Sequence, residues 1–236
     1  MSDVTFFWSL RFQEHMSFIK LIALILRLVN GSQIIKQAMK LRRKWALVQK
    51  GAIDDQEPLI AETRTFKQKV KRTLVPLSSA VAKCWLELVS HMLEELDEYE
   101  RLTHQADPDQ VTNLLHEIRR WSEEHAEAET FVVCQVPKLV NLKDPLTKSL
   151  LTTAGAKNKR IAAQLKRLRT MKSSTNAKNK FLSLSTVHMT NATAFLKDIL
   201  PQLDMPPSSK TAVAALVRHE GAEARWAHQR IFHAKT

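Results

Sequence analysis

The stretch VSHMLEELDEY, residues 89–99, places a histidine and a glutamate four residues apart. This spacing puts His91 and Glu95 one turn apart on the same face of an α-helix. The same His-x-x-x-Glu spacing returns near the C-terminus, as His219 and Glu223. We therefore expect two similar helices, each presenting an imidazole and a carboxylate to the core.

A second motif, Glu-His, occurs once before each of these helices, at Glu14-His15 and at Glu124-His125. In chain order the motifs read Glu-His, His-x-x-x-Glu, Glu-His, His-x-x-x-Glu. The order predicts a duplicated helical unit whose four histidines point from four helices toward a common centre.

The polar stretch QADPD, residues 105–109, is the best candidate for a linker between the two halves. We expect a first repeat unit over residues 1–104 and a second over residues 110–236, both packed as one domain. At 236 residues the chain has enough apolar material for a sizeable core.

The composition predicts an all-α chain. Leu, Ala, Lys, Glu, Gln and Arg dominate, Gly occurs only 4 times, and alternating β-branched runs are nearly absent. Long helices joined by short polar turns are typical of a bundle. Asn30-Gly31 is an expected helix stop, Gly155 an expected bend, and residues 172–180 an expected loop. The expected helices cover residues 5–30, 32–50, 58–76, 77–104, 111–136, 146–171, 181–200 and 210–233.

The chain is basic, with 36 basic and 24 acidic residues and a net charge of +12. The excess gathers in residues 36–50, 67–72 and 157–180. Such a balance indicates contact with nucleic acid, a membrane surface or an acidic protein, and a merely solvated basic surface is the alternative. The expected anion-binding residues are Lys40, Arg42, Arg43, Lys44, Lys157, Lys159, Arg160, Lys166, Arg167 and Arg169.

The two cysteines, Cys84 and Cys134, lie in apolar helical contexts and predict buried thiols in a reducing compartment. Residues 16–29 are apolar but include Lys20 and Arg27, and they are too few to span a bilayer. We therefore expect an intracellular, cytoplasmic protein without a signal peptide or a membrane span. The sequence leaves the oligomeric state open.

Histidine and glutamate converging in a helical core suit a transition metal, because imidazole and carboxylate together accept iron, manganese or zinc. Iron or manganese is expected, with zinc as an alternative. Core histidines that only form hydrogen bonds with their neighbours are the competing interpretation. The predicted ligands are His15, His91, Glu95, His125, His219 and Glu223, and the residues expected to orient them are Glu14, Glu98, Tyr99 and Glu124.

The remaining motifs exclude several classes of enzyme. No nucleophile triad, glycine-rich phosphate loop or dinucleotide fingerprint is present. The sequence also lacks a helix-turn-helix signature or an aromatic-rich RNA motif. Four further histidines do not follow the repeat and are interpreted as surface or structural residues: His116, His188, His228 and His233.

A family resemblance adds to this interpretation. FFWSLRFQEHMSFIKLIAL, residues 6–24, resembles the opening of a bacterial family of duplicated, ferritin-like helical proteins of unknown function. In that family a histidine follows a tryptophan by seven residues, as His15 follows Trp8. ETRTFK, residues 62–67, and the segment from His91 to Tyr99 resemble two further family motifs.

The second half resembles this family less, and Ile118 stands where the tryptophan would be. The resemblance implies a ferritin-like bundle that binds iron or manganese, with an oxidoreductase or metal-handling role and no established reaction. The alternative function is a non-catalytic basic helical scaffold that binds nucleic acid or an acidic partner in a larger assembly.

Overall fold

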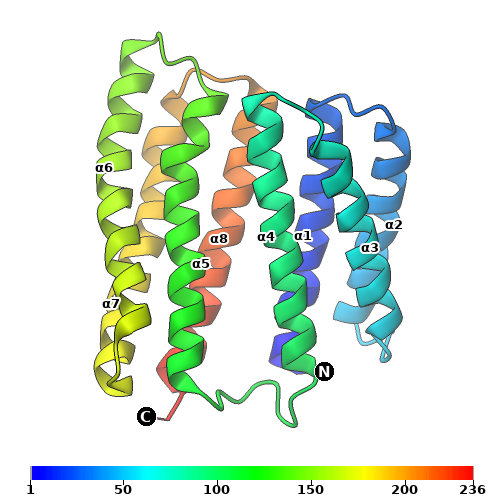
Figure 1. Cartoon of the computed structure of the whole chain (residues 1–236), viewed down its shortest axis with the longest axis vertical. Helices are drawn as coiled ribbons and strands as arrows, with labels where there is room; N and C mark the ends of the chain where they lie inside the picture. The colour runs from blue at the N-terminus through cyan, green and yellow to red at the C-terminus, as the bar shows by residue number, and fades with distance from the viewer. Residues whose placement is uncertain (1, 236) are drawn as a thin grey trace. The chain divides into compact units, whose positions relative to one another are not determined.

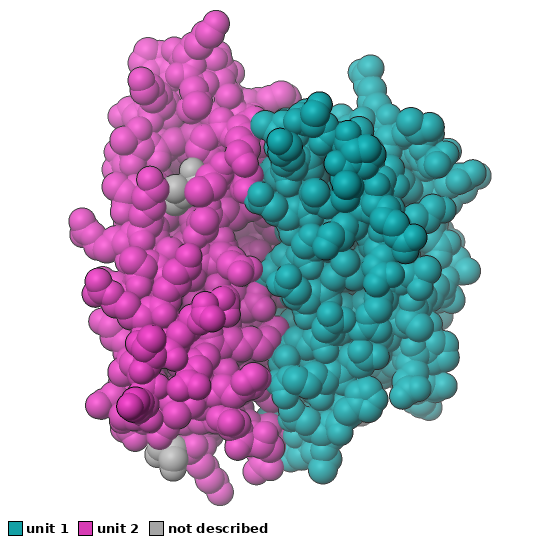
Figure 2. Space-filling model, viewed as in Figure 1, with its two compact units in different colours: residues 1–109 teal, residues 110–236 magenta. Residues whose placement is uncertain are grey.

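The computed structural model describes residues 2–235, apart from the side chains of residues 132 and 133. These residues form α-helices with short 3₁₀ and π segments, and the described chain contains no strand, which confirms the all-α prediction. The chain divides into two compact units, residues 1–109 and 110–236, shown in separate colours in Figure 2. We call them unit 1 and unit 2 and describe each by itself.

Unit 1 is a bundle of α1 (Asp3–Ile25), α2 (Gly31–Gln49), α3 (Glu57–Leu74) and α4 (Ala80–Thr103) (Figure 1). Helix α1 packs along α2 and against α4, and α3 packs along α4. Short turns join the helices, so successive helices run in opposite directions. The first and last helices of the unit, which carry the Glu-His and His-x-x-x-Glu motifs, are therefore neighbours.

Aromatic side chains fill the middle of unit 1. The ring of Phe12 lies 4.6 Å from that of Trp45 and 5.2 Å from that of Tyr99, between ring centroids. All three side chains are fully buried. The indole N–H of Trp45 donates to the hydroxyl of Thr63 at 3.0 Å, so this buried polar group is satisfied. The cluster ties α1, α2 and α4 together.

The first helix ends earlier than the sequence predicted. Helix α1 stops at Ile25, and the chain turns through Arg27, whose φ of 47° is left-handed. The amide of Leu28 then bonds the carbonyl of Ala23 at 3.3 Å. Gly31, the expected stop, instead begins α2. A non-glycine residue, Arg27, has the left-handed conformation in the turn, and the helix ends several residues before the expected stop.

Unit 2 is a second bundle, of α5 (Leu114–Cys134), α6 (Pro145–Arg167), α7 (Ser174–Ala194) and α8 (Pro207–His233) (Figure 1). Helix α5 contacts all three of the others, and α7 packs along α8. Four short segments connect or extend these helices: the 3₁₀ helices η1 (Val136–Leu139), η2 (Leu168–Thr170) and η4 (Leu200–Gln202), and the π-helix η3 (Phe195–Ile199).

Two helix boundaries in unit 2 correct the sequence analysis. Residues 174–180, expected as loop, form the first two turns of α7, because Ser173 caps them by accepting from the amide of Asn176. Helix α6 runs without a break through Gly155. Residues 172 and 173 lie outside the helix as expected, and the polar composition of residues 174–180 reflects a largely exposed helix face.

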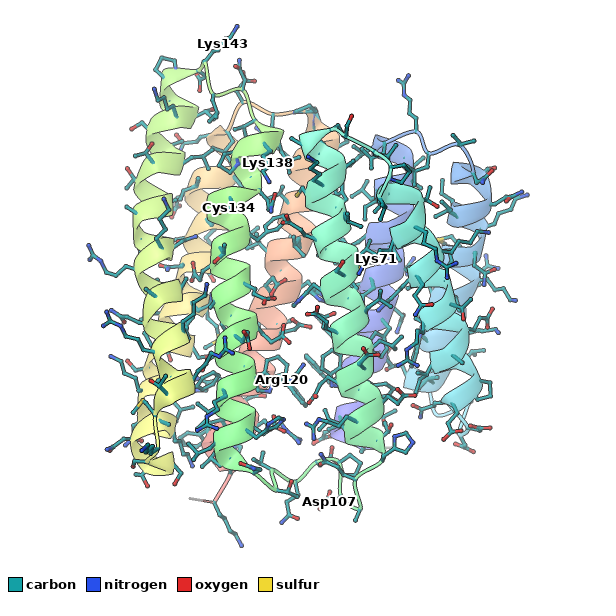
Figure 3. All side chains as sticks on the ribbon, viewed as in Figure 1. Lys71, Asp107, Arg120, Cys134, Lys138 and Lys143 are labelled. Atoms are coloured by element: carbon teal, nitrogen blue, oxygen red, sulfur yellow. The ribbon has the colours of Figure 1, made fainter. Side chains whose placement is uncertain are left out.

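The cysteines differ in their surroundings. Cys84 is buried as expected, whereas Cys134, labelled on α5 in Figure 3, is exposed, so the prediction of two buried thiols was half wrong. Cys134 is the last residue of its helix. Within residues 2–235 no helix combines the length and the apolar character that a bilayer span requires.

Candidate metal centre

In unit 1 the carboxylate of Glu95 lies between two imidazoles. His15 Nε2, on α1, is 2.7 Å from Glu95 Oε2, and His91 Nε2 is 2.9 Å from Glu95 Oε1. Glu95 and His15 are almost completely buried, while the side chain of His91 is 13% exposed. The four-residue spacing on α4 accounts for the second contact, and the packing of α1 on α4 accounts for the first.

A buried lysine completes this cluster. The amine of Lys67, on α3, lies 3.1 Å from His15 Nδ1 and donates to the carbonyl of Met92 at 2.5 Å. Lys67 is 0% exposed, and burial lowers its pKa to about 7 although the charge of Glu95 opposes this shift. The chain Lys67–His15–Glu95–His91 therefore links three helices through polar contacts.

Sequence analysis missed Lys67 as part of this cluster, although a signal was present. The buried residues of α3 include Thr63, Phe66, Val70 and Leu74, which form one stripe with a helical period. Lys67 lies on that stripe. A lysine on an apolar stripe is unusual, because burying an ammonium group without a partner costs several kcal/mol.

The donor types of this cluster, imidazole and carboxylate, are ones that a transition metal takes. Two imidazole nitrogens and one carboxylate are the ligands of many non-haem iron sites. Binding requires an unprotonated Nε2 on His15 and on His91. Because the carboxylate of Glu95 accepts, the proton of a neutral His15 ring resides on Nε2 in the metal-free protein, and Nδ1 accepts from the amine of Lys67. Metal binding at Nε2 would therefore release that proton.

In unit 2 the expected ligands occupy a different environment. His219 Nε2 lies 3.3 Å from Glu223 Oε1 within α8, and both side chains are buried. The ring of His125 is stacked between the rings of Phe181, at 5.4 Å, and His188, at 4.9 Å. Neither ring nitrogen of His125 has a hydrogen-bond partner among the described residues. Burial lowers the pKa of His125 well below its usual value, and the neighbouring His188 adds to the effect.

His188 is a second residue whose place the sequence did not reveal. It was interpreted as surface or structural, and its burial contradicts the surface interpretation. Its Nδ1 lies 2.8 Å from the carboxylate of Glu129 on α5, which is also buried. Because a carboxylate accepts, the proton of a neutral His188 ring resides on Nδ1. No signal in the sequence paired these residues, which lie 59 positions apart.

Three of the four residues expected to orient the histidines contact arginines on their own helices. Glu14 pairs with Arg11 at 2.8 Å, Glu98 with Arg101 at 2.6 Å, and Glu124 with Arg120 at 3.5 Å.

The fourth, Tyr99, donates its hydroxyl to the side chain of Gln56, and burial raises the pKa of Tyr99 to about 12. An orienting role for these four residues stays a prediction.

The expected anion-binding residues are all at least partly exposed, but they differ in their partners. On α2, Lys40 and Lys44 both pair with Glu62, at 3.3 and 2.5 Å, and the contact with Lys44 is the main cause that lowers the pKa of Glu62. Arg169, in η2, pairs with Glu123 at 2.7 Å. Seven others are exposed: Arg42, Arg43, Lys157, Lys159, Arg160, Lys166 and Arg167.

The chain has no match among protein-family models, curated proteins or solved structures. The resemblance to the duplicated ferritin-like family therefore stays a prediction. We therefore base the functional proposal on the geometry of the two units.

Proposed function

We propose that this chain is a metal-binding helical protein that holds one iron or manganese ion in unit 1 through His15, His91 and Glu95. The observation that carries the proposal is the buried carboxylate of Glu95 with an imidazole nitrogen within 3 Å of each oxygen. Two neutral imidazoles and one carboxylate favour iron(II) or manganese(II), and zinc is the competing ion. The ferritin-like resemblance of residues 6–24 points to the same class of protein.

The proposed site would use its surroundings in two ways. The aromatic cluster on α1, α2 and α4 keeps bulk water from His15, which strengthens the interaction between the ion and its ligands. The partial exposure of His91 leaves a route by which an ion reaches the site. Three protein ligands would leave further coordination positions for water or a substrate, as an oxidoreductase or a metal-handling protein requires. We also propose that the fold is a ferritin-like bundle that arose by duplication of one helical unit.

Elemental analysis tests the proposal directly. Protein produced in medium containing iron, manganese and zinc should carry about one ion per chain, and His91→Ala and Glu95→Gln should each carry at least about tenfold less. His104→Ala is the matched control, because His104 is an exposed histidine at the end of the same helix and should leave the metal content unchanged. Metal-free wild-type protein, or equal metal in all variants, would refute the proposal.

The predictions for unit 2 can be tested in the same way. His219→Ala and His125→Ala should each lose metal if these histidines are ligands, as the sequence analysis predicts.

Binding should also release protons, because the imidazole ligands must be unprotonated, so the affinity should rise with pH through the range in which histidine titrates. Isothermal titration in two buffers of different ionisation enthalpy measures the number of protons released.

A further inference from the structure

The positive charge of this protein is concentrated in one unit. Residues 1–109 contain 16 basic and 14 acidic residues, whereas residues 110–236 contain 20 basic and 10 acidic residues. Unit 2 therefore carries +10 of the net charge of +12. Within it, residues 145–197, which include α6 and α7, have eleven basic residues and no acidic residue.

The basic side chains of α6 form two rows. At about 100° per residue, Lys148, Lys159 and Lys166 lie within about 20° of one another around the helix. Arg160 and Arg167 form a parallel row about a quarter-turn away. From the first lysine to the last the row extends about 27 Å along the helix axis. All five side chains are exposed. We call this set of five residues the α6 basic face.

The α6 basic face lacks internal neutralisation. None of its five residues forms an ion pair with a described residue, in contrast to Lys40 and Lys44 on α2, which share Glu62. Like charges aligned along a helix raise the free energy of the folded chain. A polyanion that spans the two rows would remove that repulsion and release its own condensed counterions.

The surroundings of the face point to a particular polyanion. Helix α6 contains no aromatic residue, and Phe181, the aromatic residue of α7, is buried, so these helices offer no stacking platform for unpaired bases. An acidic protein partner would need aromatic or aliphatic side chains on this face, which become buried in the interface. A membrane surface would need an apolar face on these helices. The described exposed apolar side chains of α6 and α7 are only Leu146, Val187 and small alanines.

We propose that the α6 basic face binds the phosphate backbone of a nucleic-acid duplex without reading its sequence. A length of about 27 Å corresponds to about eight base pairs, at about 3.4 Å per pair. Duplex DNA and duplex RNA share this phosphate chemistry. The inference is independent of the proposed metal site, which lies in unit 1.

Fluorescence anisotropy with a labelled 24-base-pair duplex of DNA, and a second of RNA, tests the proposal over 50–300 mM salt. Five phosphate contacts give a slope of about −4.5 for log K against log salt concentration, which is about a 500-fold loss of affinity from 50 to 200 mM. Binding of either duplex with such a slope supports the proposal. The duplex that binds more tightly shows whether the face takes DNA or RNA.

Two quadruple variants localise the contact. The α6 variant, Lys159→Gln, Arg160→Gln, Lys166→Gln and Arg167→Gln, should reduce the slope to about −1. The α2 variant, Lys36→Gln, Lys40→Gln, Arg42→Gln and Arg43→Gln, removes the same charge from unit 1 and should leave the slope unchanged. Circular dichroism checks that both variants keep their helices, as expected for exposed positions.

Three results would overturn the proposal. The first is the absence of binding to either duplex at 50 mM salt. The second is an equal loss of slope in the α6 and α2 variants, which would indicate a general charge effect. The third is tighter binding of a single strand of the same length, or of phosphatidylserine vesicles, than of either duplex.

Discussion

The two units carry the same pair of motifs in the same order but surround the first histidine in different ways. In unit 1, His15 has a polar group at each ring nitrogen, Lys67 at Nδ1 and Glu95 at Nε2. In unit 2, His125 lies between two rings, and neither of its nitrogens has a hydrogen-bond partner among the described residues. The residue on the third helix differs as well, being a lysine in unit 1 and His188 in unit 2.

This difference shows that a Glu-His motif predicts that its histidine is buried but does not determine which groups surround the ring. The neighbours of the ring come from other helices of the unit, α3 and α4 in unit 1 and α7 in unit 2, and they decide whether the histidine joins a polar network or an aromatic stack. A polar network in a buried site is strong only when all its members are satisfied. In unit 1 His15 has a polar partner at each ring nitrogen, and for this reason we place the proposed metal site there.

The largest expected effect concerns the carboxylate of unit 1. Glu95→Ala should lower the free energy of unfolding of the metal-free protein by about 3–5 kcal/mol, because it leaves Lys67 and two histidines without their carboxylate. Urea denaturation measures the change. Glu62→Ala, which removes a partly exposed carboxylate from α3 of the same unit, should cost less than about 1 kcal/mol. Equal effects of the two substitutions would mean that the buried network adds no stability.

Much of this architecture was predictable because it depends on local sequence. Helix-forming composition, i to i+4 spacing and apolar periodicity act within one turn or two, and they identified the all-α fold and the contact between His91 and Glu95. The motif order predicted that four histidines share one centre, and in unit 1 two of them, His15 and His91, contact Glu95. Helix ends were less well predicted, because a single cap such as Ser173 or a left-handed Arg27 moves them by several residues.

The missing parts of the site are contacts through space. Lys67 lies 52 positions from His15, and His188 lies 59 positions from Glu129. No local pattern connects residues so far apart, although the position of Lys67 on an apolar stripe marked it as unusual. The distribution of charge was visible in the sequence, but only the ion pairs with Glu62 distinguish α2 from α6.

A smaller effect should appear in the pH dependence of stability. In the folded protein Lys67 has a pKa of about 7, whereas an unfolded lysine keeps a pKa of about 10.4. Between these values the unfolded chain binds one more proton, so stability rises with pH, by up to about 1.4 kcal/mol per pH unit. Lys67→Met should remove this contribution, seen as a smaller increase in the free energy of unfolding from pH 7 to pH 9.

The matched control for Lys67 is Lys69→Met, an exposed lysine on the same helix. It should show the same pH dependence as the wild type. If Lys67→Met and Lys69→Met behave alike in metal-free protein, the amine of Lys67 is protonated in the folded state, and burial does not lower its pKa.

The smallest effect distinguishes an aromatic stack from ordinary apolar packing around His125. Phe181→Leu keeps most of the apolar volume and removes the ring, so it should cost about 1 kcal/mol more than Phe195→Leu. Phe195 is also buried in unit 2, at 4% exposed, but has no ring neighbour in the part of the chain that the structure describes. Urea denaturation of both variants measures the difference. Equal costs would show that the ring contact adds nothing to the free energy of unfolding. His125 would then be stabilised by burial alone, and the main energetic contrast with His15 would be lost.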